Sequence, residues 1–406
     1  MTFISMKDAS GKESKLGAPE TDRGDPLSIS VRVSQPLPAG RYTVSWRTAA
    51  SDGHPSHGSF SFVVLTEIAP PGHVAVPQIG TVRDTLGIAA TTASSTRPEN
   101  KEEADAASSL SNSLARTFSF VGLLALIGTI VFRTLVLPRA RGTNAELTEL
   151  MVRGAAVLGL AASVLVIASA FARIFLESQM MSAMPDMQTM SMADMAMHTR
   201  WGFAVELELG AALVALVSFA LAVRRIRGAW LVATMSAIVL AVTPALAGHA
   251  ASSPRFTSLM IVSDFLHILG GASWLGSLLA VMVVGIPLSL TLDGAERWPT
   301  VASLVNSFSP IALSSAAVVV VSGLIASWVH VEHLSDLWQT SYGQVLMIKL
   351  ALVAITLTIG AYNFRKVQPQ LANEAGSARL KRSAALELSV GFLILLVTGF
   401  LTGISP

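Results

Sequence analysis

Methionine is concentrated in one short stretch, SQMMSAMPDMQTMSMADMAMH (residues 178–198), which holds eight of the fifteen methionines and ends in a histidine. Methionines at helical spacing usually fill a core, but this stretch contains no Leu, Ile, Val or Phe, and Pro185 disfavours a continuous helix. Thioether sulfur is a soft ligand that selects Cu(I). We therefore predict a loop that captures Cu(I), with the ligands Met180, Met181, Met184, Met187, Met190, Met192, Met195, Met197 and His198.

The overall composition is that of a membrane protein. Of the 406 residues, 52% are hydrophobic and 13% are charged, and the mean hydropathy is +0.59. Soluble domains carry about 25% charged residues. The formal net charge of +2 gives no reason to expect a nucleic-acid partner. Cysteine is absent, which excludes disulfides, thiol nucleophiles and Cys-type zinc sites and leaves Met, His and carboxylates as metal ligands.

Eight apolar runs are long enough to cross a bilayer, which takes about 20 residues. The residues before them are polar and rich in turn formers, and SWRTA (45–49) and SFSFVV (59–64) alternate as strands do. We predict a mainly α, polytopic membrane protein with a small N-terminal all-β domain at 1–68, a flexible linker at 69–112 and an eight-helix membrane domain at 113–406. Its expected spans are 116–137, 152–176, 202–223, 229–248, 258–288, 303–328, 343–364 and 383–403, and its outer loop 177–201 holds the methionines.

Lysine and arginine gather in alternate breaks between these runs, and the positive-inside rule places those breaks in the cytoplasm. Both termini, the methionine loop and the segment around His249 then lie outside. Seven of the eight histidines fall in outer segments or at outer helix ends, whereas His267 lies inside the fifth span. At 1.5 Å per residue, His267 is about 15 Å from the outer end of that span. The imidazoles are therefore expected to serve the outer side of the membrane.

Ionisable groups inside spans are costly and mark candidate functional positions. Asp264 and His267 are three residues apart and share a helical face, and Lys349 on the seventh span is at a depth that suits an ion pair with Asp264. Glu206 and Glu208 lie in the outer half of the third span. An alternative is that these groups satisfy one another and only fix the helix packing.

A metal path is the second interpretation of the same groups. His249 at the outer boundary and His267 deeper inside would be successive stations for a metal ion. Glu387 on the eighth span and Asn363 on the seventh lie nearer the cytoplasm. They either continue the path or only pack.

Several motifs resemble two copper-protein families. WRTAASDGHPSHGSFSFVV (46–64), with GRYTV (40–44) before it, resembles the end of a CopC-type copper-binding β-sandwich. GHA (248–250), DFLHILGGASWLG (264–276), SYGQVLMIKLALV (341–353) and LELSVGFLILLVTGFL (386–401) resemble the CopD membrane family. The chain is thus similar to a CopC–CopD fusion, which implies copper handling at the bacterial plasma membrane.

The CopC resemblance implies a Cu(II) pair at Asp52 and His54, since carboxylate and imidazole suit Cu(II). The family's third ligand is a histidine at the mature N-terminus. This chain starts MTF, has no histidine before His54, and shows neither the family's first strands nor a signal peptide. We therefore expect a partial sandwich, through truncation or a misassigned start.

The sequence favours a non-enzymatic copper-binding membrane protein that transports copper, by uptake across the plasma membrane, or confers copper resistance. Copper ions, the lipid bilayer and periplasmic copper carriers are the expected partners. One alternative is a b-type haem cytochrome or metal reductase, because intramembrane histidine can ligate haem. Another is a copper sensor that does not transport. No Walker, kinase-like or aspartyl-phosphate signature indicates an ATP-driven pump.

Overall fold

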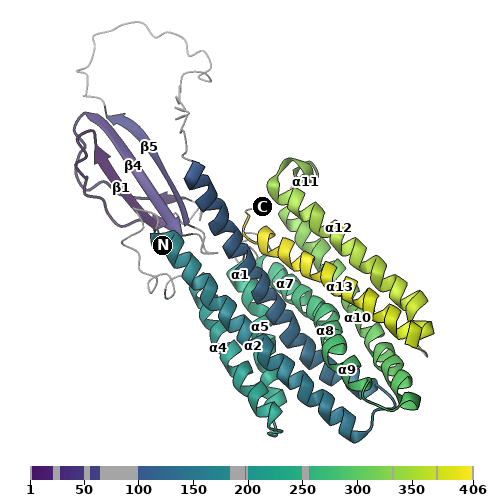
Figure 1. The fold of residues 1–406 in the computed structure, drawn as a ribbon. Helices are drawn as coiled ribbons and strands as arrows, with labels where there is room; N and C mark the ends of the chain where they lie inside the picture. Colours follow the sequence, from purple (N-terminus) through teal and green to yellow (C-terminus); the bar gives the residue numbers. More distant parts are fainter. Residues whose placement is uncertain are drawn as a thin grey trace, which may run out of the picture. The chain divides into compact units, whose positions relative to one another are not determined.

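The computed structural model describes residues 2–21, 28–49, 55–64, 99–182, 197, 200–248, 256–331, 333–371 and 374–404. Contacts divide the chain into two units, Met1–Ala104 and Asp105–Pro406, which are drawn in Figure 1. Each unit is described by itself below.

The first unit contains a three-stranded antiparallel sheet, as predicted for the N-terminal domain. Its strands are β1 (Thr2–Asp8), β4 (Gly40–Ala49) and β5 (Pro55–Val64), in the order β1-β4-β5. Two short strands, β2 (Glu20–Thr21) and β3 (Ile29–Ser30), pair separately. Alternation along β4 buries Tyr42, whose ring stacks on Phe62 of β5 at 5.7 Å between centroids.

Eight helices of the described residues are long and apolar enough to cross a membrane. They confirm the eight predicted spans, and most extend a few residues beyond the predicted limits. Their ranges are Leu110–Arg139, Ala145–Gln179, Arg200–Val223, Ala229–Ala247, Thr257–Ser289, Gly294–Val329, Ser341–Gln370 and Ala378–Leu401. Figure 1 shows them side by side within the second unit.

Several spans are built from more than one helical segment. The first consists of α1 (Glu99–Val131) followed by a π turn and a 3₁₀ turn, and the second and third are α2 (Ala145–Ser182) and α4 (Arg200–Val223). The fourth, sixth and eighth are α5 (Ala229–Ala247), α10 (Gly294–His330) and α13 (Glu374–Leu401). The seventh is α12 (Ser341–Tyr362), preceded by the short α11 (Asp336–Gln339) and continued by the π turn η6 (Asn363–Val367).

The start of α1 differs from the prediction. The helix begins at Glu99, so the last part of the predicted linker 69–112 is helical. Residues 99–109 read ENKEEADAASS, and Glu, Lys and Ala are strong helix formers. The composition of this segment therefore accounts for its helical structure.

The fifth span is interrupted by π-helical turns that the apolar pattern did not predict. It comprises α7 (Thr257–Gly271), the π turn η4 (Ala272–Gly276), α8 (Ser277–Ala280), the π turn η5 (Val281–Gly285) and α9 (Ile286–Ser289). Such turns are rare and are frequently found at functional sites. The first of them carries Trp274.

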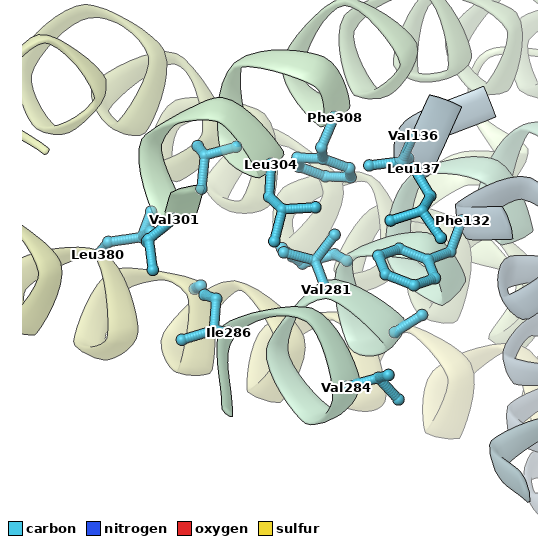
Figure 2. Packing of buried hydrophobic residues seen from close by; sticks show 14 of the residues in the cluster. Phe132, Val136, Leu137, Val281, Val284, Ile286, Val301, Leu304, Phe308 and Leu380 are labelled. Carbon is cyan, nitrogen blue, oxygen red and sulfur yellow. The ribbon is translucent and has the colours of Figure 1, made fainter. Parts of the chain in front are cut away.

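Close packing around the fifth span uses glycine where two helices meet. A Cβ atom on Gly276 would lie 1.9 Å from the carbonyl oxygen of Leu124 on α1, and one on Gly128 would lie 2.1 Å from the backbone of Gly276. Only glycine allows such a close approach of two backbones. Beside this contact lies an apolar cluster, part of which Figure 2 shows, where Phe132, Val281 and Leu304 come from three different helices.

Candidate metal-binding site

His267 lies on α7, in the first half of the fifth span, with its imidazole against α10. Nδ1 of His267 is 3.0 Å from Oγ of Ser322. Gly323 follows on α10, and a Cβ atom there would already touch Cε1 of the ring at 3.4 Å. The absence of a side chain at Gly323 therefore lets the imidazole lie against the α10 backbone.

The hydrogen bonds of Ser322 favour one tautomer of His267. The Ser322 hydroxyl donates to the carbonyl oxygen of Val318 at 2.7 Å. A hydroxyl has one hydrogen, so while Ser322 donates to Val318 its Oγ accepts from His267. Nδ1 is then the protonated nitrogen, and Nε2 keeps its lone pair. A neutral imidazole held by a hydrogen bond at Nδ1 is the form in which histidine ligates metals through Nε2.

Charged groups of α7 and α12 surround this histidine. The positive charge of Lys349 acts on His267, and the negative charge of Asp264 acts on both Lys349 and Tyr342. Asp264 and Lys349 are thus close enough for their charges to interact, and an ion pair between them stays a prediction. Lys349 is therefore a charged neighbour of the imidazole, and Asp264 is a charged neighbour of Lys349.

A second polar group lies deeper, between the fifth, seventh and eighth spans. Glu387 is 4% exposed and accepts two hydrogen bonds, from Nε1 of Trp274 at 2.8 Å and from Nδ2 of Asn363 at 3.0 Å. The pairing of Glu387 and Asn363 agrees with their expected depth. Trp274 follows His267 by seven residues, which is about two helical turns, or 10 Å, along the span.

This deeper group lines a cavity of about 280 Å³. Most of the lining is apolar, and its polar or polarisable side chains include Glu387, Asn363 and Met282, together with Ser309, Gln368 and the cationic Arg365. Oδ1 of Asn363 is buried and has no hydrogen-bond partner among the described residues. The cavity therefore offers carboxylate, amide and thioether groups, which are three kinds of potential metal ligand.

A third buried polar group occupies the other half of the bundle. Glu208 forms an ion pair with Arg173 of α2 and accepts a hydrogen bond from Oγ of Ser119 on α1 at 2.9 Å. Glu206, two residues earlier, is exposed. Both glutamates were singled out from the sequence, but Arg173 was missed. An arginine inside an apolar run is the feature that could have indicated it. The partners of Glu208 are those of a packing network.

The other proposed copper ligands are not placed as a site. Met180 and Met181 lie in the last residues of α2, and Met197 is 67% exposed. Among the residues that the structure describes, no three histidine or carboxylate side chains gather in a way that could hold a metal ion. The remaining predicted ligands lie outside the described residues: Asp52, His54, Met184, Met187, Met190, Met192, Met195, His198 and His249.

Comparison with known proteins finds copper families along most of the chain. The CopC domain matches residues 1–65, the N-terminal domain of copper resistance protein D-like proteins matches 107–254, and copper resistance protein D matches 302–401. His267 lies between the last two matched ranges, whereas Ser322, Lys349 and Glu387 lie inside the third. No solved structure matches.

Curated relatives are also copper proteins by name. The copper transport protein CutJ of Bacillus subtilis is 27% identical over 177 residues, which is 44% of this chain and 31% of that protein. Copper resistance protein C of Escherichia coli is 38% identical over 65 residues, 16% of this chain and 52% of that protein. The corresponding protein of Pseudomonas syringae is 46% identical over 41 residues, 10% of this chain and 32% of that protein.

The matches thus span about a third to a half of the relatives' own lengths. Eight membrane-spanning helices, a small antiparallel sheet and three adjoining family matches agree with one another. The chain is a multi-pass membrane protein that belongs to the copper resistance and copper transport families, as a CopC–CopD fusion.

Proposed function

We propose that this protein moves copper ions across the bacterial plasma membrane, in the direction of uptake, with His267 as an intramembrane copper ligand. The observation that carries the proposal is the hydrogen-bond chain from Val318 through Ser322 to Nδ1 of His267, because it leaves the lone pair of Nε2 available. Copper is the transported substrate in this proposal. Copper resistance would follow from the same capacity to bind and move the ion.

Capture takes place on the outer side. The methionines of residues 180–197 offer soft, exchangeable thioethers for Cu(I), and His198 and His249 add imidazoles at the expected membrane boundary. In the CopC-like domain, Asp52 and His54 would bind Cu(II), delivered by periplasmic copper carriers. Weak, repeated ligands allow the ion to be passed on, since conduction requires that no site hold it too tightly.

Passage through the membrane uses the two polar groups in order of depth. An ion released from His267 reaches the cavity beside Trp274 two helical turns further along the same span. The carboxylate of Glu387 would offset the positive charge there, and Met282 supplies a thioether. An ionisable residue inside a span that faces a cavity is the usual mark of an ion pathway.

The alternatives of a haem cytochrome and a non-transporting sensor gain no support from the comparisons, which name copper resistance and copper transport. Ligation of haem between two helices needs a second histidine at a similar depth. The described side chains that interact with His267 include Ser322 and Lys349. They form no haem-ligand pair.

The test is Cu(I) uptake into proteoliposomes that contain the intact chain, with empty liposomes as the baseline. We expect uptake above this baseline, and a reduction of about tenfold or more in the rate for His267→Leu, because an apolar side chain cannot ligate copper. His333→Leu is the matched control, since His333 is an exposed outer histidine. Uptake equal to that of empty liposomes, or equal rates for the intact chain and His267→Leu, would refute the proposal.

Direction is measured in the same system. Vesicles loaded with copper and diluted into copper-free buffer report export, and copper-free vesicles placed in copper report import. Labelling of the protein with a membrane-impermeant reagent shows in which orientation it is inserted in each vesicle preparation. Net transport only toward the expected periplasmic side would contradict uptake.

A further inference from the structure

A cavity of about 580 Å³ lies at the end of the bundle where α2 begins and α4 ends. It is formed where the first span ends, the second begins, and the third connects to the fourth. Its lining includes Arg133, Glu149, Arg153, Arg225, Arg227 and Trp230. The volume is within the range of about 300–1,000 Å³ that is typical of small-molecule sites.

The charge of this lining is strongly positive. The lining contains four arginines and one glutamate, which gives a net charge of +3. Glu149 is paired with Arg225, with 2.7 Å between Oε1 and Nε, and both side chains are largely exposed. Glu149 is the one acidic residue of the lining, so the charges of Arg133, Arg153 and Arg227 are left without a carboxylate counterpart in the cavity.

Arg133 is held in place by an aromatic ring. Its guanidinium carbon lies 4.6 Å from the ring centroid of Trp230. Nε of Arg133 is buried and meets no acceptor among the residues that the structure describes. An arginine that only extended toward water would place its donors in solvent. Arg133 is instead oriented by stacking, and its Nε is a donor that no described residue uses.

Planar guanidinium groups bind phosphate through paired, charge-assisted hydrogen bonds. Basic pockets between membrane helices on the cytoplasmic side are a known setting for anionic lipid headgroups. We propose that this cavity binds a phosphate group, carried either by an anionic lipid headgroup or by soluble phosphate. Occupation would tie together the ends of the first four spans.

The experiment uses the full chain in neutral detergent. Lipid retention is measured by native mass spectrometry, and the thermal melting midpoint is followed in parallel, with phosphatidylglycerol, phosphatidylcholine or inorganic phosphate added. We expect phosphatidylglycerol to bind about tenfold more tightly than phosphatidylcholine, the difference that about 1.4 kcal/mol produces. The melting midpoint should rise with the lipid that binds.

The variant Arg133→Gln/Arg153→Gln should remove this preference. The matched control is Arg139→Gln/Arg382→Gln, which changes two exposed arginines outside the cavity lining and should keep it. If the double variant does not fold, Arg153→Gln alone is used, because Arg153 is exposed. It should still weaken phosphatidylglycerol binding.

The outcomes separate the two sources of phosphate. A preference for phosphatidylglycerol that inorganic phosphate does not reduce identifies a lipid headgroup. Stabilisation by inorganic phosphate that is lost in the variant identifies soluble phosphate. Equal binding of both lipids without an effect of phosphate, or the same behaviour in the variant and in the intact chain, overturns the proposal.

Discussion

Removing one partner from the buried ion pair of Arg173 and Glu208 should destabilise the membrane unit. Their side chains are 16% and 9% exposed, so Arg173→Met leaves a carboxylate that water reaches poorly. Breaking a buried pair in this way costs about 3–5 kcal/mol. Oε1 of Glu208 keeps its bond from Ser119 at 2.9 Å, so the lower value, about 3 kcal/mol, is expected.

This free energy translates into a measurable shift of the melting midpoint. For domains of 150–250 residues, 1 kcal/mol corresponds to roughly 2–4 °C. The unit Asp105–Pro406 is larger than that range, so the expected loss is about 6 °C. The assay is thermal denaturation in detergent, followed by size-exclusion chromatography of the protein that stays folded.

A second change on the same pair provides the decisive comparison. In Arg173→Met/Glu208→Gln no charge is left unpaired, and the amide oxygen introduced at position 208 can still accept from Ser119. We expect the double variant to regain at least half of the lost melting temperature. The control is Glu206→Gln on the same helix, an exposed position where the change should be below about 0.5 kcal/mol. If Arg173→Met melts like the intact chain, or the double variant melts no higher than Arg173→Met, the ion pair does not stabilise the bundle.

Three further predictions concern packing and copper capture. Gly276→Ala should lower the free energy of unfolding by at least about 1–3 kcal/mol, because a Cβ atom there meets the α1 backbone at 1.9 Å. The control is Gly210→Ala, where an added Cβ atom has nothing within 4 Å. Equal melting midpoints of the two variants would contradict the close approach of the two helices. Trp274→Phe removes a donor to Glu387 and should cost about 1–3 kcal/mol; an unchanged melting midpoint would show that this hydrogen bond adds nothing. Changing the eight methionines of residues 180–197 to leucine should weaken Cu(I) binding in a competition titration with a chromophoric chelator while leaving Cu(II) binding unchanged, and unaltered Cu(I) affinity would exclude the loop as the capture site.

The eight-helix architecture was predictable because the thickness of the bilayer sets the minimum length of an apolar run that can span it. Each expected span has a counterpart in the structure, since no competing signal interrupts the runs. The π turn at Ala272–Gly276 was not predictable, because its residues ASWLG continue the same apolar pattern. Helix-forming residues at 99–109 were likewise read as linker because they carry little apolar signal.

The partners of the polar residues needed the structure. Asp264 and His267 share a face by spacing alone, whereas Ser322 is 55 positions from His267. Trp274 and Glu387 are separated by 113 positions. Contacts of this kind depend on which helices pack together and on how each helix is rotated about its own axis. The periodicity of apolar residues along one helix determines neither. The sequence therefore predicted which residues are costly to bury but not which neighbours satisfy them.

The most direct test of the account is copper K-edge X-ray absorption on Cu(I)-loaded protein that lacks residues 178–198. Without the methionine loop, the account predicts a nitrogen contribution to the copper shell that is smaller in His267→Leu and unchanged in His333→Leu. A copper shell that is the same in all three proteins would contradict the assignment of His267 as the ligand within the membrane.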